Sequence, residues 1–311
     1  MRIVILDKKT LGDDIDLGKF DTFGEVVMYE STTKDETKTR VKDADIVITN
    51  KVVIDREIMD NSDIKLICVA ATGMNNIDLE YAKSKNITVK NVAGYSTPSV
   101  VQTTFSLALY LIGKLRYLDE YTKSDDGWVK SPIFTNLDKP YYDIAGKTWG
   151  IIGLGSIGKG VSKVATAFGA NVQYYSTSGR NEDENIQRSS LEDLLKTSDI
   201  ISIHSPLNAQ TNNLINKENL PLLKDNALLL NLGRGGIINE ADLAKYIDAN
   251  NILVGLDVLE AEPMVEDNPL RYVKDANKLF ITPHIAWASV ESRIKLVDGI
   301  CKNIKEYFGE K

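Results

Sequence analysis

The chain has 311 residues, of which 43% are hydrophobic and 26% are charged, a composition typical of a globular protein with about two domains. Its formal net charge of -7 argues against nucleic acid or an anionic membrane as the main partner. The sequence contains no secretion signal and no apolar run of membrane length. Its two cysteines, Cys68 and Cys301, lie in apolar segments typical of free thiols in a reducing compartment. We therefore expect a cytoplasmic protein without a disulfide or a metal site.

Strands and helices alternate through the first hundred residues. Short, apolar and mostly β-branched runs are typical of buried parallel strands, and they occur at Arg2–Leu6, Glu25–Tyr29, Ile46–Thr49, Lys65–Ala70 and Thr88–Asn91. Helical segments such as Asp55–Asn61 and Asp78–Lys85 lie between them. This alternation predicts a doubly wound α/β unit of modest size.

The middle of the chain has a different pattern. One long helix is predicted from Pro98 to Leu118, because Ser96-Thr97-Pro98-Ser99 is typical of a helix start. The irregular stretch Ser124–Tyr142 follows and contains two prolines. A stretch of this length is either a functional loop or an interface arm.

A second α/β unit is predicted from Lys147 onward. Its strand candidates are Thr148–Ile152, Val172–Tyr175, Ile200–His204, Ala227–Asn231, Leu253–Asp257 and Leu279–Thr282. A final helix, Ser289–Phe308, is expected to return to the first unit. The elements together predict an α/β protein with two doubly wound parallel sheets and a cleft between them, in which ligands bind beyond the carboxyl ends of the strands.

The segment Gly153-Leu-Gly155-Ser-Ile-Gly158 gives the strongest functional signal. It has the form G-x-G-x-x-G and stands between a predicted strand and a helix-like run, Lys159–Phe168. In this motif the first glycine permits a tight turn, the second lets the backbone approach a pyrophosphate, and the third lets the helix pack closely on the strand. The motif therefore predicts a dinucleotide-binding domain.

The end of the next strand indicates which dinucleotide is bound. Ser176 stands where an acidic residue commonly binds the adenosine ribose, and Thr177, Ser178 and Arg180 follow it. Hydroxyl groups and an arginine favour a 2′-phosphate, which a carboxylate would repel, so NADP(H) is slightly favoured over NAD(H). The alternative is a polar solvated turn on an enzyme that uses NAD(H), because the acidic residues 182–184 weaken the positive field.

Acid–base candidates are few, because the chain has only two histidines. His284 follows a predicted strand, and three carboxylates follow the strand before it: Asp257, Glu260 and Glu262. A carboxylate bonded to one imidazole nitrogen fixes the tautomer and favours the protonated ring, which can then donate a proton to a carbonyl group. His204 also ends a strand, where a structural role is the more common one.

Arg234 lies among glycines in Asn231-Leu-Gly-Arg-Gly-Gly236, directly after another predicted strand. Glycines let a ligand approach the backbone, and a guanidinium group binds a carboxylate through two hydrogen bonds. We interpret Arg234 as a group that binds a substrate carboxylate rather than as a surface charge. Lys51 is a further candidate for binding a small polar acid, and a solvated lysine is an equally common explanation.

These segments together resemble the D-isomer-specific 2-hydroxyacid dehydrogenases over essentially the whole chain. The matching segments are Ala71–Asp78, Gly153–Gly158, His204–Leu207, Asn231–Gly236, Leu256–Pro263 and Pro283–Ala286. The resemblance implies a Rossmann nucleotide domain, residues 99–283, inserted into a flavodoxin-like substrate domain, residues 1–98 and 284–311. It also implies a homodimer held through the nucleotide domain and the crossing helix.

The resemblance implies roles for single residues as well. Arg234 would bind the substrate carboxylate and carbonyl, Glu262 would orient the histidine, and His284 would donate the proton. The backbone N–H groups of Thr72 and Gly73 would meet the substrate carboxylate. The residues implied in cofactor binding, beyond the glycines and the Ser176–Arg180 turn, are Thr72, Ser156, Ile157, Ser205, Leu232, Gly233, Asp257 (at the nicotinamide carboxamide) and His284.

Within the family, Thr49–Lys51, Ser99–Thr104 and His284–Ser289 are similar to the branch of glycerate dehydrogenases and hydroxypyruvate reductases. The expected reaction is the reduction of a small 2-keto acid, similar to hydroxypyruvate or glyoxylate, to the D-2-hydroxy acid. The alternative within the family is a dehydrogenase of D-lactate or of branched D-2-hydroxy acids. Two alternatives lie outside it: a dinucleotide-sensing binding module without turnover, and a relative that oxidises formate or phosphite.

Overall fold

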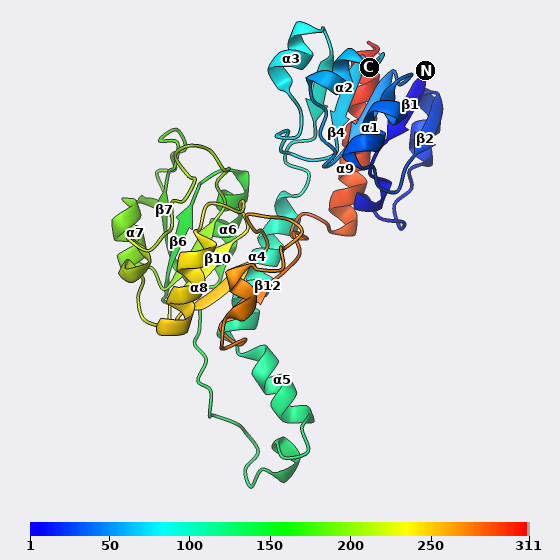
Figure 1. Cartoon of the computed structure of the whole chain (residues 1–311). Coiled ribbons are helices and arrows are strands. Elements are labelled where there is room, and N and C mark those ends of the chain that lie inside the picture. Colours follow the sequence, from blue (N-terminus) through cyan, green and yellow to red (C-terminus); the bar gives the residue numbers. More distant parts are fainter. Residues whose placement is uncertain (310–311) are drawn as a thin grey trace. The chain divides into compact units, whose positions relative to one another are not determined.

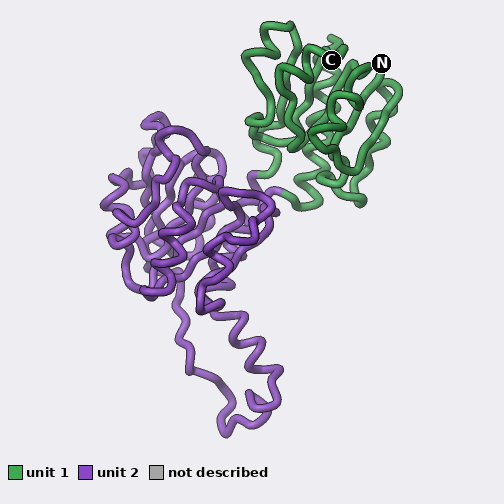
Figure 2. Tube along the Cα trace, viewed as in Figure 1, with its two compact units in different colours: residues 1–96, 288–311 green, residues 97–287 purple. Residues whose placement is uncertain are grey.

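The computed structural model describes residues 1–309 and divides the chain into two compact units (Figure 2). Unit 1 comprises Met1–Ser96 together with the C-terminal segment from Ala288, and unit 2 comprises Thr97–Trp287. The predicted boundaries, 98/99 and 283/284, compare with 96/97 and 287/288 in the structure. The second difference places His284 in unit 2, because its loop is hydrogen-bonded to the end of a unit 2 strand.

A five-stranded parallel sheet forms the centre of unit 1 (Figure 1). Its strands are β1 (Arg2–Ile5), β2 (Glu25–Met28), β3 (Ile46–Thr49), β4 (Leu66–Val69) and β5 (Thr88–Asn91). Their order, β2-β1-β3-β4-β5, is that of flavodoxin-like sheets and confirms the predicted fold. The apolar runs of β3 and β4 are completely buried, as expected for parallel strands that are covered on both faces.

The helices of unit 1 are α1 (Lys34–Val41), α2 (Arg56–Asp60), α3 (Leu79–Ser84) and α9 (Val290–Tyr307). The C-terminal helix α9 packs against β4 and β5. The Ser289 hydroxyl caps it by accepting the Ser292 N–H, and its buried apolar residues recur at helical spacing. The helix predicted over Ser289–Phe308 is therefore confirmed.

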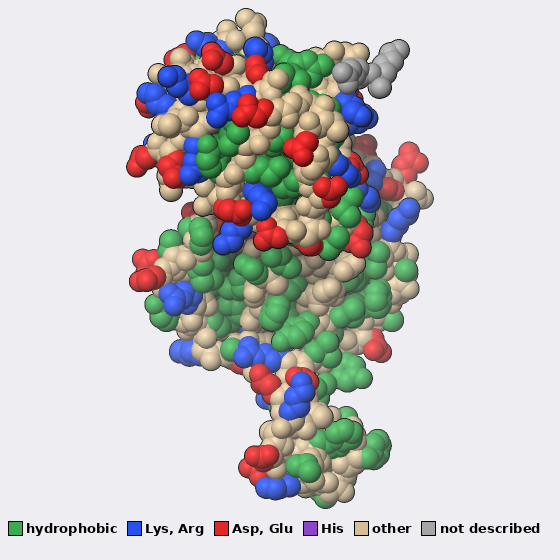
Figure 3. All heavy atoms as spheres, turned by 90° about the vertical axis from the view of Figure 1, so that its right-hand side faces the viewer, with side chains coloured by type: hydrophobic (Ala, Val, Ile, Leu, Met, Phe, Trp, Pro, Cys, Tyr) green, Lys and Arg blue, Asp and Glu red, His purple; other side chains and the backbone are tan. Residues whose placement is uncertain are grey.

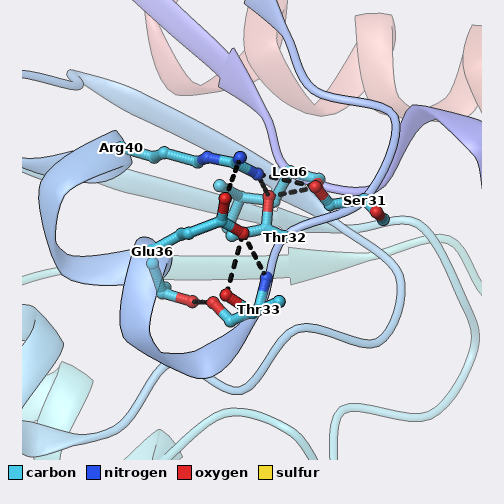
Figure 4. Close-up of polar contacts among 7 residues, drawn as sticks. Leu6, Ser31, Thr32, Thr33, Glu36 and Arg40 are labelled. Atoms are coloured by element: carbon cyan, nitrogen blue, oxygen red, sulfur yellow. Dashed lines mark hydrogen bonds and ion pairs between the residues drawn. The ribbon is translucent and has the colours of Figure 1, made fainter.

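The start of α1 shows how local sequence sets a helix boundary (Figure 4). Thr33 and Glu36 form a capping box, in which the Thr33 N–H donates to Glu36 Oε2 over 2.9 Å. One turn later, Arg40 donates to Glu36 Oε1 over 2.6 Å and to the Thr32 hydroxyl over 2.7 Å. The same hydroxyl donates to the Leu6 carbonyl, so the helix start is bound to the residue that follows β1.

Unit 2 is built on a seven-stranded parallel sheet. Its strands are β6 (Thr148–Ile152), β7 (Asn171–Tyr175), β8 (Gln187–Arg188), β9 (Ile200–Ile203), β10 (Leu228–Asn231), β11 (Leu253–Leu256) and β12 (Leu279–Ile281). The order β12-β11-β10-β9-β6-β7-β8 is that of a Rossmann sheet with one further strand, and the switch point lies between β6 and β9. The sequence did not predict β8, because its two exposed residues have no apolar pattern.

The helices of unit 2 are α4 (Thr97–Ile112), α5 (Leu115–Lys123), α6 (Ser156–Ala167), α7 (Leu191–Thr197) and α8 (Glu240–Ala249). The prediction of one continuous helix over Pro98–Leu118 is wrong. The chain interrupts it after α4, where Lys114 adopts a left-handed φ of +53° that an α-helix does not accommodate. No helix within residues 1–309 is both long and apolar enough to span a membrane.

Residues 115–142, which include α5, project from the rest of unit 2 and are called the arm (Figure 1). Apolar side chains of the arm are exposed, among them Val129 (77%), Phe134 (88%) and Leu137 (77%). Figure 3 shows hydrophobic side chains on the surface of this projection. Clusters of exposed apolar side chains are typical of surfaces that bind another protein.

Candidate active site

The glycine loop joins β6 to α6 at the carboxyl edge of the unit 2 sheet, beside the switch point. Gly153 has a φ of +96°, and a Cβ there would lie 2.9 Å from the backbone N of Ser205. A Cβ on Gly158 would lie 2.3 Å from the Gly153 carbonyl oxygen, so this glycine lets α6 pack on the strand end. A Cβ on Gly155, the N-cap of α6, would meet nothing within 4 Å. The loop therefore has a tight turn, close packing and open space in front of a helix N-terminus, as an anion-binding loop requires.

Buried polar atoms without partners lie at the same edge of the sheet. The Oγ atoms of Ser176, which follows β7, and Ser205, near the end of β9, have no hydrogen-bond partner within the described chain. Both ring nitrogens of His204 are also buried and unpartnered there. Since buried polar groups are normally hydrogen-bonded, these atoms fit a bound group with polar atoms of its own, such as a dinucleotide.

His204 cannot serve as a proton donor near neutral pH. Burial lowers the pKa of its imidazole to about 3, so the ring is neutral. A neutral, buried ring agrees with the structural role expected for His204.

The turn after β7 bears one exposed arginine, Arg180, and a second arginine lies nearby on β8. Ser178 and Arg180 are exposed, and the Ser178 hydroxyl accepts the Arg180 N–H over 3.3 Å. Arg188 on β8, which sequence analysis missed, lies near the same turn and forms a 3.2 Å ion pair with Glu182. Of the predicted phosphate set, the Ser176 hydroxyl is buried, Thr177 is half-buried, and Ser178 and Arg180 are exposed.

The loop that carries Arg234 is braced by the last residue of β10. The buried Asn231 side chain accepts the Gly233 N–H over 3.0 Å and donates to the Arg234 carbonyl over 2.9 Å. The Arg234 guanidinium donates to the Gly233 carbonyl over 2.8 Å and is half-buried. These contacts hold the arginine close to its own loop, and the remaining guanidinium N–H groups can bind a carboxylate.

His284 and Glu262 are in direct contact, since His284 Nδ1 lies 2.6 Å from Glu262 Oε2. The other carboxylate oxygen, Glu262 Oε1, accepts the Leu259 N–H over 3.0 Å. Of the carboxylates that follow β11, Glu262 is therefore the one that the structure brings to the histidine. Because a carboxylate oxygen accepts, His284 Nδ1 bears a proton and donates it to Glu262 Oε2. The other ring nitrogen, Nε2, then points away from Glu262, as in a general acid that is oriented by a carboxylate.

Asp257 anchors the loop on which His284 lies. Its buried carboxylate accepts the Thr282 hydroxyl over 2.6 Å, the Ile285 N–H over 2.9 Å and the Ala286 N–H over 3.0 Å. Burial raises the pKa of this carboxyl, and the hydrogen bonds from Thr282, Ala286 and Ile285 oppose that effect. The His284 backbone, at a left-handed φ of +54°, also donates to the Asp257 carbonyl over 2.8 Å. The histidine is thus held in a strained position by bonds on both sides.

The predicted substrate residues of unit 1 lie after β3 and β4, which are neighbours in its sheet. The buried Asp7 carboxylate accepts the Asn50 N–H over 3.0 Å and the Lys51 N–H over 2.7 Å, and so holds this loop. The Lys51 side chain is exposed. The carbonyl of Thr72 accepts the Asn91 amide over 2.6 Å. Within residues 1–309, no group of three or more His, Cys, Asp or Glu side chains is arranged to hold a metal ion.

Sequence analysis missed the buried polar residues that support these loops, among them Asp7 and Asn231. Each of them stands at or just after a strand end, where a single polar residue interrupts an apolar run. That position is a usable signal, because a polar side chain at a buried strand end needs hydrogen-bond partners in the adjoining loops. Which loops supply those partners depends on the order of the strands in the sheet.

Comparison with known proteins extends over both units. The family model described as D-isomer specific 2-hydroxyacid dehydrogenase, NAD binding domain, matches residues 105–286. A hydroxypyruvate reductase of Blautia hydrogenotrophica is 36% identical over 315 residues, which cover 99% of this chain and 97% of the relative. A glycerate dehydrogenase of Methylorubrum extorquens is 36% identical over 314 residues, which cover 100% of this chain and 97% of the relative.

Among solved structures, an acyclic imino acid reductase in complex with NADPH and D-Arg is similar, with a TM-score of 0.87 and 30% identity. The similarity covers 99% of this chain and 97% of that one. The segment matched by the NAD-binding family model contains the glycine loop, Arg234, Glu262 and His284. Unit 2 is therefore a nicotinamide-dinucleotide-binding domain.

Proposed function

This chain belongs to the D-isomer specific 2-hydroxyacid dehydrogenase family, and on that premise we propose that it reduces a small 2-keto acid to the D-2-hydroxy acid with NAD(P)H. The observation that carries the proposal is the 2.6 Å contact between His284 and Glu262. The contact lies at the carboxyl edge of the sheet that also bears the glycine loop and Arg234. A proton donor, a carboxylate-binding cation and a dinucleotide loop are the groups that this reduction needs.

In the proposed mechanism, the Arg234 guanidinium binds the carboxylate of the substrate and polarises its keto group. His284 donates the proton on Nε2 to the keto oxygen, while Glu262 stabilises the ring through Nδ1. When bound by the glycine loop, a reduced nicotinamide dinucleotide would supply the hydride that converts the keto carbon to the carbon of a C–OH group. One hydride and one proton are consumed for each hydroxy acid formed.

One residue proposed to hold the cofactor, Thr72, belongs to unit 1, and the others lie around the glycine loop and along the same edge of the unit 2 sheet. The complete set is Thr72, Gly153, Gly155, Ser156, Ile157, Gly158, Ser176, Ser178, Arg180, Ser205, Leu232, Gly233, Asp257 and His284. The orphaned Oγ atoms of Ser176 and Ser205 support this assignment, because a bound group would give them partners. Asp257 would receive the nicotinamide carboxamide in addition to the three hydrogen bonds it already accepts.

For the cofactor, we propose a slight preference for NADP(H) over NAD(H). Ser178 and Arg180 are exposed after β7, where the 2′-phosphate of NADP(H) would lie, and Arg188 adds a second cation nearby. The similar imino acid reductase was solved with NADPH, which agrees with this preference. Glu182 opposes it by pairing with Arg188.

For the substrate, we propose a small acid similar to hydroxypyruvate or glyoxylate. The relatives of this chain include proteins named hydroxypyruvate reductase, glycerate dehydrogenase and glyoxylate reductase. Arg234 and His284 would bind the keto acid, with the backbone N–H groups of Thr72 and Gly73 and the ammonium of Lys51 as further contacts. The Lys51 ammonium would favour hydroxypyruvate over pyruvate, because the third carbon of hydroxypyruvate bears a hydroxyl group and that of pyruvate is a methyl group.

We further propose that the enzyme is a homodimer. The exposed apolar residues of the arm would be covered by a second copy of the chain. We also propose that the enzyme is cytoplasmic. Its cysteines, Cys68 and Cys301, are free, and the reducing conditions of the cytoplasm keep thiols reduced.

The test is a steady-state assay that combines NADPH and NADH with glyoxylate, hydroxypyruvate, pyruvate and a branched 2-keto acid. Fast oxidation of NADPH with hydroxypyruvate or glyoxylate is the expected result. Fast turnover with pyruvate or the branched acid alone would replace the proposed substrate with the precursor of D-lactate or of a branched hydroxy acid. Tight dinucleotide binding without turnover of any acid would overturn the enzymatic proposal in favour of a dinucleotide-sensing module.

A further inference from the structure

Glu240 is the first residue of α8 and is only 9% exposed. Its Oε1 accepts the Glu260 N–H over 2.6 Å, and its Oε2 accepts an N–H of the Asn268 amide group over 2.7 Å. Glu260 and Asn268 both belong to the segment between β11 and β12, which also bears Glu262. The carboxylate therefore joins the start of α8 to the segment that orients the proposed proton donor.

Consecutive peptide groups connect Glu240 to Glu262. The Leu259 N–H donates to Glu262 Oε1 over 3.0 Å, and the next N–H, that of Glu260, donates to Glu240. Because the backbone between two adjacent N–H groups has only two soft dihedral angles, holding the second group restricts the direction of the first. The carboxylate of Glu262 is then presented to His284 Nδ1 from a backbone that Glu240 holds in place.

A close approach of two backbones supports the same arrangement. A Cβ on Gly235, one residue after Arg234, would lie 1.8 Å from the Leu259 carbonyl oxygen and 2.4 Å from the Glu260 N. Only a glycine allows the Arg234 loop to lie this close to the Leu259–Glu260 peptide. The peptide held by Glu240 is thus also the one on which the Arg234 loop rests.

We propose that Glu240 is a positioning residue for catalysis, which sets the geometry of the Glu262–His284 pair through the Leu259–Glu260 backbone. The kinetic part of this inference rests on the proposed function, in which His284 donates the proton. The structural part, that Glu240 controls the hydrogen bond between Glu262 and His284, is independent of which substrate is reduced.

The decisive variant is Glu240→Gln, with Asp242→Asn as its matched control. A glutamine retains one acceptor oxygen and turns an NH2 group toward a donor, so one of the two hydrogen bonds is lost. Asp242 lies in the same turn of α8, and its carboxylate also accepts a backbone N–H, that of Lys217, over 3.0 Å. The segment around Lys217 bears no proposed site residue. Asp242→Asn neutralises a carboxylate in the same turn of the helix, but its amide oxygen can still accept the Lys217 N–H, so the control separates loss of a charge from loss of a bond to the segment that bears Glu262.

The primary readout is the Nδ1 proton of His284 in the tag-free, histidine-labelled protein, observed by NMR. With only two histidines in the chain, the neutral His204 serves as an internal reference. The expected result is a downfield Nδ1 resonance in the parent and in Asp242→Asn that is shifted or lost in Glu240→Gln. Loss of about tenfold to 10²-fold in kcat, with the dinucleotide Kd unchanged, is expected in the same variant.

An unchanged Nδ1 resonance in Glu240→Gln, or equal loss of the resonance in both variants, would overturn the inference. Asn268→Ala, which removes the partner of Oε2 and also the bond that Asn268 Oδ1 accepts from the Leu270 N–H, covers the case in which Glu240→Gln does not fold. It should shift the resonance in the same direction by less, and a resonance identical to that of the parent would contradict the proposal. Because the NMR comparison needs no substrate, a parent without turnover would refute the proposed function while leaving this inference testable.

Discussion

The two halves of the unit 2 sheet differ in how polar groups are used at their carboxyl ends. After β6 the loop is held by glycine geometry, and the buried polar atoms of Ser176, His204 and Ser205, beyond the ends of β7 and β9, have no partner in the described residues. After β10, β11 and β12, buried polar side chains are bonded to neighbouring loops: Asn231 to the Arg234 loop, and Asp257 to the His284 loop. The first half therefore has buried polar atoms without hydrogen-bond partners, whereas Asn231 and Asp257 in the second half are hydrogen-bonded to the neighbouring loops.

The difference follows from what each half does in the proposed reaction. A dinucleotide brings many polar atoms of its own, so the binding half can leave hydrogen-bonding groups to be satisfied by the ligand. Proton transfer needs heavy atoms placed within a few tenths of an ångström, so the catalytic half must hold its donor before the substrate arrives. His284 has a strained backbone with a φ of +54°. Its own N–H is bonded to the Asp257 carbonyl and the N–H of Ile285 to the Asp257 carboxylate, and these bonds hold the residue in that conformation.

Replacing the proposed proton donor should have the largest effect. We expect His284→Ala to lower kcat for 2-keto acid reduction by about 10²–10⁴-fold, because general acid catalysis contributes on that scale. Dinucleotide binding, followed by the fluorescence of bound NADPH, should change little, since the glycine loop is untouched. A kcat within tenfold of the parent would mean that another group supplies the proton.

Arg234→Lys should come next, with kcat/KM lower by about 10- to 10²-fold, because a lysine loses a charge-assisted hydrogen bond to the substrate carboxylate. Arg271→Lys is the matched control, since Arg271 is exposed and bonds the Glu266 carbonyl outside the proposed site. Steady-state kinetics on both variants makes the comparison. Equal, small effects in the two variants would refute the carboxylate role of Arg234.

Two glycine variants separate packing from ligand approach in the binding half. Gly158→Ala should lower the free energy of unfolding by about 1–3 kcal/mol, because its Cβ would overlap the Gly153 carbonyl oxygen at 2.3 Å. Gly155→Ala should leave stability close to that of the parent and weaken dinucleotide binding, since its Cβ enters open space. Urea denaturation and NADPH titration measure the two effects. A loss of stability in Gly155→Ala and none in Gly158→Ala would contradict the geometry of this loop.

The smallest effect is expected at the turn after β7. Arg180→Ser should reduce kcat/KM with NADPH by about five- to tenfold, because an exposed charge-assisted contact contributes only about 1 kcal/mol. The same constant measured with NADH should not change, which makes NADH the internal control. An equal loss with both cofactors would show that Arg180 does not contact a 2′-phosphate.

Much of this protein could be predicted from the sequence because the signals are local. Apolar runs, capping residues and the glycine spacing each involve residues within one turn or one strand, so the strand positions and the dinucleotide loop needed no tertiary information. The order of these elements along the sequence, with the family resemblance, also predicted both fold types. The failure at Lys114 is local as well: a single residue with a left-handed backbone divides a pattern that is otherwise helical.

Residue spacing did not decide which polar groups meet; the tertiary structure did. Of Asp257, Glu260 and Glu262, which closely follow β11, spacing does not distinguish the one that contacts His284 from the one that anchors its loop, and Glu262 was expected beside His284 only from the family resemblance. Glu240 resembles an ordinary acidic residue in the first turn of a helix, where the helix dipole alone would explain it. Its partners come from the next strand connection, and they become neighbours because β10 and β11 pair in parallel and end at the same edge. Hydrogen bonds between loops depend on strand order, which is set by burial of the whole sheet and is not encoded in any single segment.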